Sequence, residues 1–177
     1  RRVLFRSIVS NEDGQGVLRF IDAKTGRTKL EPNLPVGVIT GLRFHETNPE
    51  VAFSLASAQS PSDIYTVSLK GKIERWTESE TGGLNPEKFV SPTLEKMKSF
   101  DGLGISAFVY APDAKKFPGK RPVLILIHGG PESQSLPTFQ GRYNYLMNEL
   151  GVAMVVPNVR GSAGYGKTFL TLDNGVK

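Results

Sequence analysis

The chain has 177 residues, 38% of them hydrophobic and 22% charged, which is typical of a soluble globular protein, and no apolar run approaches the about 18 residues of a membrane span. Its net charge is +5, but Arg1, Arg2 and Arg6 supply three of these charges at one end, so we predict neither a nucleic-acid nor a membrane partner. The absence of cysteine excludes disulfides, thiolate metal sites and cysteine nucleophiles.

The first seven residues, RRVLFRS, contain no initiating Met and can be back-translated to a common sequencing-adapter oligonucleotide. We expect residues 1–7 to be a non-native, adapter-derived segment and exclude them from the prediction of the fold. The alternative is a genuine edge strand from Val3 to Phe5. Since the natural N-terminus would then be missing, we assign no cellular compartment.

Residues 8–88 consist of short strand-like runs separated by turn residues. The runs are VLRFID, VGVITGLRF, VAFSLAS and IYTVSL. Such spacing predicts antiparallel sheet, as in a propeller, a sandwich or a barrel. The segment has room for about two blades of a propeller, which are too few to close one. We therefore expect an N-terminal part to be missing.

The pattern of short strand-like runs changes after the segment GGLNPEKFVSP. LEKMKSF and ISAFVYAP indicate a hairpin that turns at Asp101-Gly102, and the continuous apolar run PVLILIH predicts a strand buried on both faces. Four apolar residues then follow at helical spacing, before Gly151, which is placed to end the helix. They are Phe139, Tyr143, Leu146 and Leu150. With VAMVV as the next buried strand, this order predicts a βαβ unit that opens a parallel α/β sheet.

The run PVLILIH leads directly into Gly129, Gly130 and Pro131, at the carboxyl end of its strand. Ligands bind at this edge of open α/β sheets, and a loop N–H here supplies part of the oxyanion hole in α/β-hydrolases. The backbone N–H of Gly130 is therefore a candidate oxyanion donor; the alternative is a tight turn. We expect His128 to orient backbone rather than abstract a proton, because no serine is demonstrably within its reach.

A second glycine-rich segment, NVRGSAGYGKTF, follows VAMVVP and matches a phosphate-binding loop literally, from Gly161 to Gly166, Lys167 and Thr168. Against nucleotide binding, residues 157–160 separate the strand from the first glycine, whereas a phosphate loop begins where its strand ends. The alternative is a structural connection, closed by an arginine fork.

In that alternative, the guanidinium of Arg160 holds backbone carbonyls or a carboxylate. We expect Tyr165 to pack rather than bind substrate. Glu132 and Asp173 are expected to be solvated or capping carboxylates. Two histidines far apart in the sequence give no support for a metal site, and we predict no cofactor.

Three segments in order, SFDGLGISAFVYAP, RPVLILIHGGPESQ and GVAMVVPNVRGSAGYGKTF, resemble the catalytic domain of the prolyl oligopeptidase family of serine peptidases, and most closely its acylaminoacyl-peptidase-like and dipeptidyl-peptidase-like branch. The resemblance covers residues 89–177, and WTESETGGLNP with the strands before it is similar to the end of that family's β-propeller. It implies the C-terminal blades of a β-propeller over residues 8–88, followed by the N-terminal part of an α/β-hydrolase domain over residues 89–177.

The resemblance implies that the full-length protein cleaves short peptides with a Ser, Asp, His triad. In the family, the nucleophile lies in a G-x-S-x-G elbow, which occurs nowhere in this sequence. We therefore expect a fragment that ends before the nucleophile and is inactive by itself. Only the N–H of Gly130 carries over as an oxyanion donor. Asn158 to Gly166 resemble a loop near the active site, with Arg160 and Gly161 in structural roles.

Two other functions remain open for the full-length protein. An esterase or lipase would share the fold, although such enzymes more often have a third glycine where Pro131 stands. A nucleotide-binding protein would use Lys167. A non-catalytic propeller adaptor is a further alternative. The sequence assigns neither the peptide specificity nor the oligomeric state.

Overall fold

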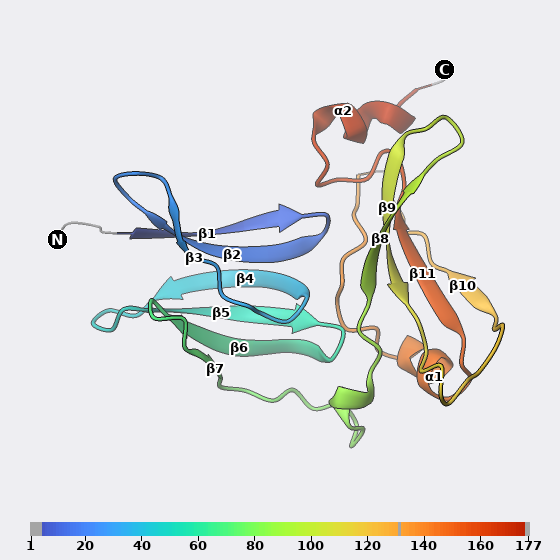
Figure 1. Cartoon of the computed structure of the whole chain (residues 1–177), viewed down its shortest axis with the longest axis horizontal. Coiled ribbons are helices and arrows are strands. Elements are labelled where there is room, and N and C mark those ends of the chain that lie inside the picture. The colour runs from blue at the N-terminus through green and yellow to red at the C-terminus, as the bar shows by residue number, and fades with distance from the viewer. Residues whose placement is uncertain (1–4, 131, 176–177) are drawn as a thin grey trace.

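The computed structural model describes residues 5–130 and 132–175, which form three sheets and little helix (Figure 1). A three-stranded sheet contains β1 (Phe5–Glu12), β2 (Gln15–Asp22) and β3 (Thr28–Leu30). A four-stranded sheet contains β4 (Gly37–Phe44), β5 (Glu50–Ser57), β6 (Ser60–Ser68) and β7 (Ile73–Arg75). The third sheet has the order β10-β11-β9-β8, from β8 (Thr93–Lys98), β9 (Gly104–Tyr110), β10 (Val123–Ile125) and β11 (Ala153–Asn158).

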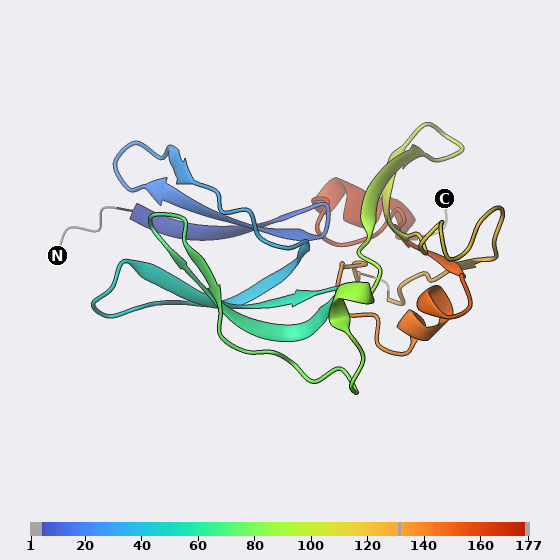
Figure 2. The ribbon, with the colours of Figure 1, turned by 60° about the horizontal axis from the view of Figure 1, so that its bottom comes forward.

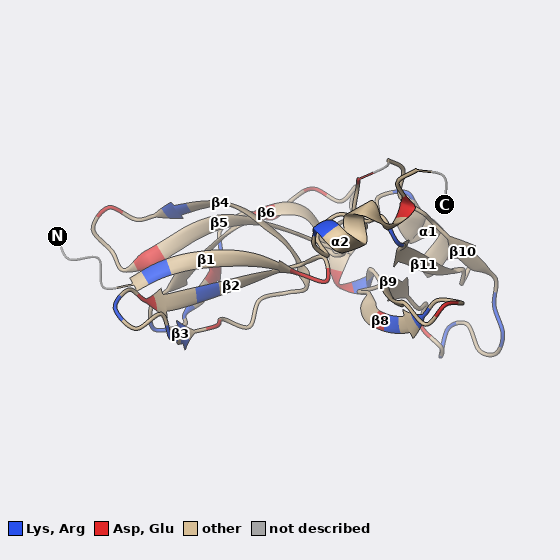
Figure 3. Cartoon of the chain, turned by 90° about the horizontal axis from the view of Figure 1, so that it is seen from above, with Lys and Arg blue, Asp and Glu red and all other residues tan. Residues whose placement is uncertain are grey.

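The helical elements are short. They are the 3₁₀ turn η1 (Pro86–Lys88), the helix α1 (Tyr143–Asn148), the helix α2 (Lys167–Leu170) and the 3₁₀ turn η2 (Thr171–Asp173). No helix among the described residues is long and apolar enough to cross a membrane. Basic and acidic residues are spread over both halves of the described chain (Figure 3).

The first two sheets lie next to each other and share one apolar core (Figures 1 and 2). Every strand pair in them is antiparallel, as the alternating runs predict. The core comes from alternate residues of β2, β4, β5 and β6, whose side chains point to the same side of each strand. Its buried members are Leu18, Phe20, Ile39, Val51, Phe53, Leu55 and Val67.

Residues 5–7, which we excluded from the fold prediction, form the start of β1. Phe5 pairs with Asp22 of β2, and its ring lies 6.1 Å from that of Phe20. Val3 lies outside the described residues, so the alternative of an edge strand from Val3 to Phe5 is described only at Phe5. The adapter origin of residues 1–7 stays a prediction, since a strand can form whatever the source of its sequence.

The third sheet combines antiparallel and parallel pairing. The β8–β9 hairpin turns at Asp101-Gly102 as predicted, with the N–H of Gly102 donating to the carbonyl of Ser99 at 2.9 Å. β10 and β11 are parallel neighbours joined through α1, which confirms the predicted βαβ order. The core of this half is formed by Ala58, Phe108, Tyr110, Met147, Met154 and Val156.

The prediction that PVLILIH is buried on both faces is wrong within the described chain. β10 is an edge strand, and its alternate residues point to opposite faces. Leu124 and Leu126 pack on the core, whereas three residues of the other face are about 60% exposed. These are Val123, Ile125 and Ile127.

The predicted helix exists but is shorter than its apolar spacing suggested. Phe139 precedes it and packs edge-on against Phe89, with ring centroids 5.5 Å apart. Gly141 has a φ of 51°, a left-handed conformation that a continuous helix cannot contain, so α1 begins only at Tyr143. Gly151 has a φ of 63°, in agreement with its predicted role at the end of the helix.

Candidate functional site

Two glycine-rich loops meet at one edge of the third sheet. The first loop, residues 128–135, follows β10, and the second loop, residues 158–166, follows β11. Because the two strands are parallel neighbours, their carboxyl ends lie at the same edge. Ligands of open α/β sheets bind at such an edge, which makes these loops the candidate site.

Asn158 joins the two loops through a pair of hydrogen bonds. Its side chain, at the end of β11, is 1% exposed. The amide oxygen accepts from the backbone N–H of Ser135 at 2.7 Å, and the amide nitrogen donates to the carbonyl of Ser135 at 3.1 Å. The hydroxyl of Ser135 donates in turn to the carbonyl of Pro157. Asn158 therefore has a structural role: it fixes the first loop to the end of β11.

A second connection joins His128 to Ser162, and it corrects one argument of the sequence analysis. We argued that no serine is demonstrably within reach of His128, but the Ser162 hydroxyl lies 2.8 Å from its Nε2 atom. This serine lies 34 residues away in the sequence, where only the fold reveals it. Ser162 is fully buried and donates to the carbonyl of Val159 at 2.6 Å, so its hydroxyl is not oriented as a nucleophile. The contact connects the two loops, and the backbone-orienting role of His128 stays a prediction.

The guanidinium of Arg160 binds a carboxylate through two hydrogen bonds. The sequence predicts that it binds either backbone carbonyls or a carboxylate. The guanidinium donates to both oxygens of Asp101 at 2.9 and 3.1 Å, and to the hydroxyl of Ser99 at 3.0 Å. It also lies 5.0 Å from the ring centre of Phe100. Hydrogen bonds from Arg160, and then from the N–H of Leu103, lower the pKa of Asp101 to about 2. Arg160 thus fixes the second loop to the β8–β9 turn.

The remaining residues of the second loop are also in structural contacts. The Tyr165 hydroxyl lies 2.7 Å from that of Ser106, and its ring lies 5.1 Å from that of Phe169, so Tyr165 packs as expected. Gly161 has a φ of 86°, and a Cβ atom there would lie 2.2 Å from the carboxylate of Asp173. Only glycine fits at this position.

The arrangement is unsuited to phosphate. The N–H groups of Gly161, Ser162 and Ala163 donate to backbone carbonyls at 3.1, 3.0 and 2.8 Å, respectively. They are therefore not free to bind the oxygens of a phosphate. The Asp173 carboxylate lies against Gly161, where it would repel a phosphate. Moreover, α2 has only 4 residues and so offers little helix dipole. The match of Gly161 to Thr168 to a phosphate-binding loop is therefore accounted for without a nucleotide.

Gly130 is exposed at the rim of the first loop. Its φ is 145°, and no hydrogen bond among the described residues uses its backbone N–H. Gly129 is exposed as well, and a Cβ atom there would meet nothing within 4 Å. Pro131 lies outside the described residues. The N–H of Gly130 therefore has the freedom to donate to a ligand, which is what an oxyanion donor requires.

The tip of the β1–β2 hairpin contacts the first loop, which the sequence did not indicate. The side-chain amide of Asn11 donates to that of Gln134 at 2.7 Å. Beside it, Lys96 of β8 pairs with Asp13 at 2.7 Å. The partners in the first contact are 123 residues apart, so only the fold brings them together.

No protein-family model matches the sequence. Among curated proteins, the chain is 31% identical over 146 residues to a prolyl endopeptidase of Elizabethkingia miricola, covering 81% of this chain and 20% of that protein. It is 31% identical over 128 residues to a probable dipeptidyl-peptidase 5 of Aspergillus flavus, covering 61% and 17%. A solved structure from a study of two prolyl endopeptidases has 25% identity and a TM-score of 0.70, covering 94% of this chain and 24% of that one.

The chain is a homologue of the prolyl oligopeptidase family. The resemblance inferred from the three motifs is thereby confirmed. The mostly antiparallel sheets correspond to part of a prolyl oligopeptidase structure. The chain spans 17 to 20% of the length of these two curated relatives.

Proposed function

We propose that the chain is part of a serine-type peptidase that hydrolyses short peptides. The observation that carries the proposal is the 31% identity to a prolyl endopeptidase over 81% of the chain. The meeting of the two glycine-rich loops at the carboxyl ends of β10 and β11 supports it, because α/β-hydrolases bind substrate at that edge.

In this proposal, residues 8–88 are about two blades of a β-propeller, and residues 89–177 are the first part of an α/β-hydrolase domain. The two antiparallel sheets that share a core support the first assignment. The β10–α1–β11 unit supports the second. The connection between the two regions is the segment around η1, whose own three residues are not buried.

The mechanistic role of this chain is electrostatic. When a serine attacks the scissile carbonyl, the carbonyl oxygen becomes negative, and the N–H of Gly130 donates a hydrogen bond to that oxygen. Hydrogen bonds of Asn158 to Ser135 and of His128 to Ser162 hold the first loop in place for that donation. In this proposal, the nucleophilic serine lies in the full-length protein outside these residues, since no G-x-S-x-G occurs in this chain. The Asp and the His of the triad are expected to follow it.

Recovery of the complete reading frame from the source DNA tests the proposal. We expect a G-x-S-x-G motif downstream of Lys177, followed by an Asp and then a His, and cleavage of peptide anilides by the complete protein. If the reading frame instead continues into a strand that ends in an acidic residue, as in nucleotide-binding proteins, and contains no such serine, the peptidase assignment is overturned. Cleavage of esters without peptides would instead indicate an esterase. The same read shows whether RRVLFRS belongs to the gene.

Replacing Gly130 in the complete enzyme tests the oxyanion role. A φ of 145° is strained for alanine, so Gly130→Ala moves the N–H away from its position. We expect kcat for a peptide anilide to fall by about 100-fold, with little change in KM. The matched control is Gly129→Ala, where the added Cβ atom meets nothing within 4 Å and kcat should change little. Equal effects of the two substitutions would exclude this role for Gly130.

A further inference from the structure

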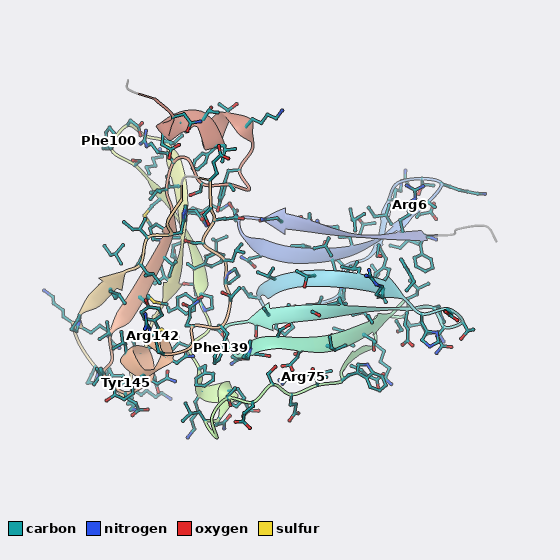
Figure 4. The ribbon with its side chains drawn as sticks, turned by 180° about the vertical axis from the view of Figure 1, so that it is seen from behind. Arg6, Arg75, Phe100, Phe139, Arg142 and Tyr145 are labelled. Atoms are coloured by element: carbon teal, nitrogen blue, oxygen red, sulfur yellow. The ribbon has the colours of Figure 1, made fainter. Side chains whose placement is uncertain are left out.

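The turn between β1 and β2 approaches the first loop closely. A Cβ atom on Gly14, which is buried in this turn, would lie 3.0 Å from the carbonyl oxygen of Ser135 and 3.0 Å from the ring of Phe108. Figure 1 shows this turn directed towards the third sheet, and in Figure 4 Arg6 marks the opposite end of the hairpin. The first half of the chain is therefore in contact with the loop that contains Gly130.

Asn11 connects this turn to the first loop through both ends of its side-chain amide. The amide oxygen accepts from the backbone N–H of Gly14 at 2.8 Å, which closes the turn, and the amide nitrogen donates to the side-chain oxygen of Gln134 at 2.7 Å. Beside it, the carboxylate of Asp13 pairs with Lys96 of β8 at 2.7 Å. The turn is thus fixed to the third sheet through Asp13 and holds Gln134 through Asn11.

Gln134 lies between this turn and the second loop. A Cβ atom on Gly164 would lie 2.6 Å from the Gln134 amide, so the Gln134 side chain packs against the backbone of the second loop. The carbonyl of its neighbour Ser133 accepts from the N–H of Ala163 at 2.8 Å. Gln134 is therefore held from two sides, by the hydrogen bond from Asn11 and by its contact with Gly164.

Gly130 lies against the backbone next to Gln134. A Cβ atom on Gly130 would lie 3.1 Å from the backbone nitrogen of Glu132 and 3.4 Å from that of Ser133, the residue directly before Gln134. Gly130 and Ser133 thus lie close together in a tight bend of the first loop. A displacement of Gln134 therefore also moves the backbone against which Gly130 lies.

We propose that Asn11 is a positioning residue for the oxyanion donor, a role that rests on the proposed function. By holding Gln134, Asn11 keeps the first loop in the arrangement that presents the N–H of Gly130 to the carbonyl oxygen of a peptide substrate. In this role Asn11 touches neither the substrate nor the reacting atoms. Because the hydrogen bond from Gly130 strengthens as the oxygen becomes negative, a misplaced N–H slows the chemical step more than it weakens substrate binding.

Substitution of Asn11 in the complete enzyme tests this role. Asn11→Leu keeps the size of the side chain and removes the hydrogen bond to Gln134, so kcat for a peptide anilide should fall about fivefold, with little change in KM. Asn48→Leu makes the same change at an exposed position in the β4–β5 turn, at the other end of the strands (Figure 1), and should leave both constants unchanged. Unchanged kcat in folded Asn11→Leu would overturn the proposal.

Asn11→Asp separates loss of the contact from a general loss of structure. Its carboxylate still accepts from the N–H of Gly14. The amide nitrogen of Gln134 has no partner among the described residues, so a half-turn of that amide lets it donate to the carboxylate. Asn11→Asp should therefore keep most of kcat. A fall in kcat as large as that of Asn11→Leu would contradict the role of this hydrogen bond.

A double-mutant cycle with Gln134→Leu tests whether Asn11 acts through Gln134. If it does, the double variant should lose no more of kcat than the more impaired single variant. Losses that multiply would mean that the two residues act independently, which would overturn the proposal. Gln134→Leu also removes the contact from the loop side, so it decides the proposal if Asn11→Leu does not fold.

Hydrogen–deuterium exchange of the complete protein distinguishes the role of Asn11 from the proposed function. The amide protons of residues 132–135 should exchange faster in Asn11→Leu than in the unaltered protein, and not in Asn48→Leu, whether or not the protein cleaves peptides. Faster exchange in a protein without peptidase activity would overturn the proposed function and confirm that Asn11 holds the first loop. Unchanged exchange in an active enzyme would overturn the role of Asn11 and leave the proposed function intact.

Discussion

Asp63 on β6 is a fully buried carboxylate whose charge is stabilised by converging donors. It accepts from Arg75 at 2.6 Å and from the hydroxyls of Thr77 and Ser79 at 2.9 and 3.1 Å, and also from Ser60. Burial raises its pKa, but these hydrogen bonds outweigh burial and lower it to about 2. A single side chain thereby connects β6, β7 and the segment that follows β7.

This pKa predicts how stability depends on pH. Asp63 titrates at about 2 in the folded chain and near 3.9 when unfolded, so it contributes stability fully above about pH 4 and loses this contribution as the pH falls towards 2. The urea midpoint of Asp63→Asn should therefore lie below that of the unaltered chain at pH 6, and the gap should narrow between about pH 4 and pH 2. Glu78→Gln, at an exposed position, is the control. A gap that stays constant down to pH 2 would contradict the argument.

At the scale of elements, the sequence was sufficient where short-range patterns determine the structure. Alternating apolar runs predicted the antiparallel strands, and Asp101-Gly102 predicted a hairpin turn, because side-chain period and turn preference are local properties. The length of α1 was not predictable in this way. Apolar spacing alone extended it to Phe139, whereas the left-handed Gly141 prevents helix before Tyr143.

The candidate site was predictable only in its outline. The strand-to-loop pattern indicated Gly130 and the loop from Asn158 to Gly166, and the fold brings both loops together. The partners of these residues were not predictable, because Asp101 lies 59 residues from Arg160, and no local pattern links the two. The same holds for His128 and Ser162. Register and topology decide which of many polar side chains meet.

Gly161 tests whether the second loop needs a residue without a side chain. In Gly161→Ala, a Cβ atom would overlap the Asp173 carboxylate at 2.2 Å, on a backbone whose φ of 86° is itself unfavourable for alanine. We expect the free energy of unfolding to fall by about 2–4 kcal/mol, measured by urea denaturation. Gly166→Ala separates the two causes, since its φ is 89° but its Cβ atom would meet nothing within 4 Å. It should cost only about 1 kcal/mol.

The double variant Gly161→Ala with Asp173→Ala completes the comparison. Removing the carboxylate removes the overlap, so the double variant should be more stable than Gly161→Ala alone, leaving only the backbone strain. If the double variant is as unstable as the sum of the two single ones, the overlap with Asp173 is not the cause.

At the scale of the whole molecule, the two halves differ in how completely their apolar surfaces are covered. The first two sheets face each other and bury a common core. The third sheet packs Leu124, Met154 and Phe108 on the core of its half. The edge strand β10 leaves its other side chains exposed to solvent, and contiguous apolar surface of this kind promotes association.

We therefore predict that the 177-residue chain self-associates through β10. Replacing Val123, Ile125 and Ile127 together by threonine keeps β-branched side chains, which favour a strand, and removes most of the exposed apolar surface. The mass measured by light scattering at equal concentration should fall towards that of a monomer, while the urea midpoint changes little because these side chains are already in solvent. Leu124→Thr, on the buried face of the same strand, should instead lower the midpoint and leave association in place or increase it. If the triple variant associates as strongly as the unaltered chain, a different surface is responsible, and the edge of β8 is the next to test.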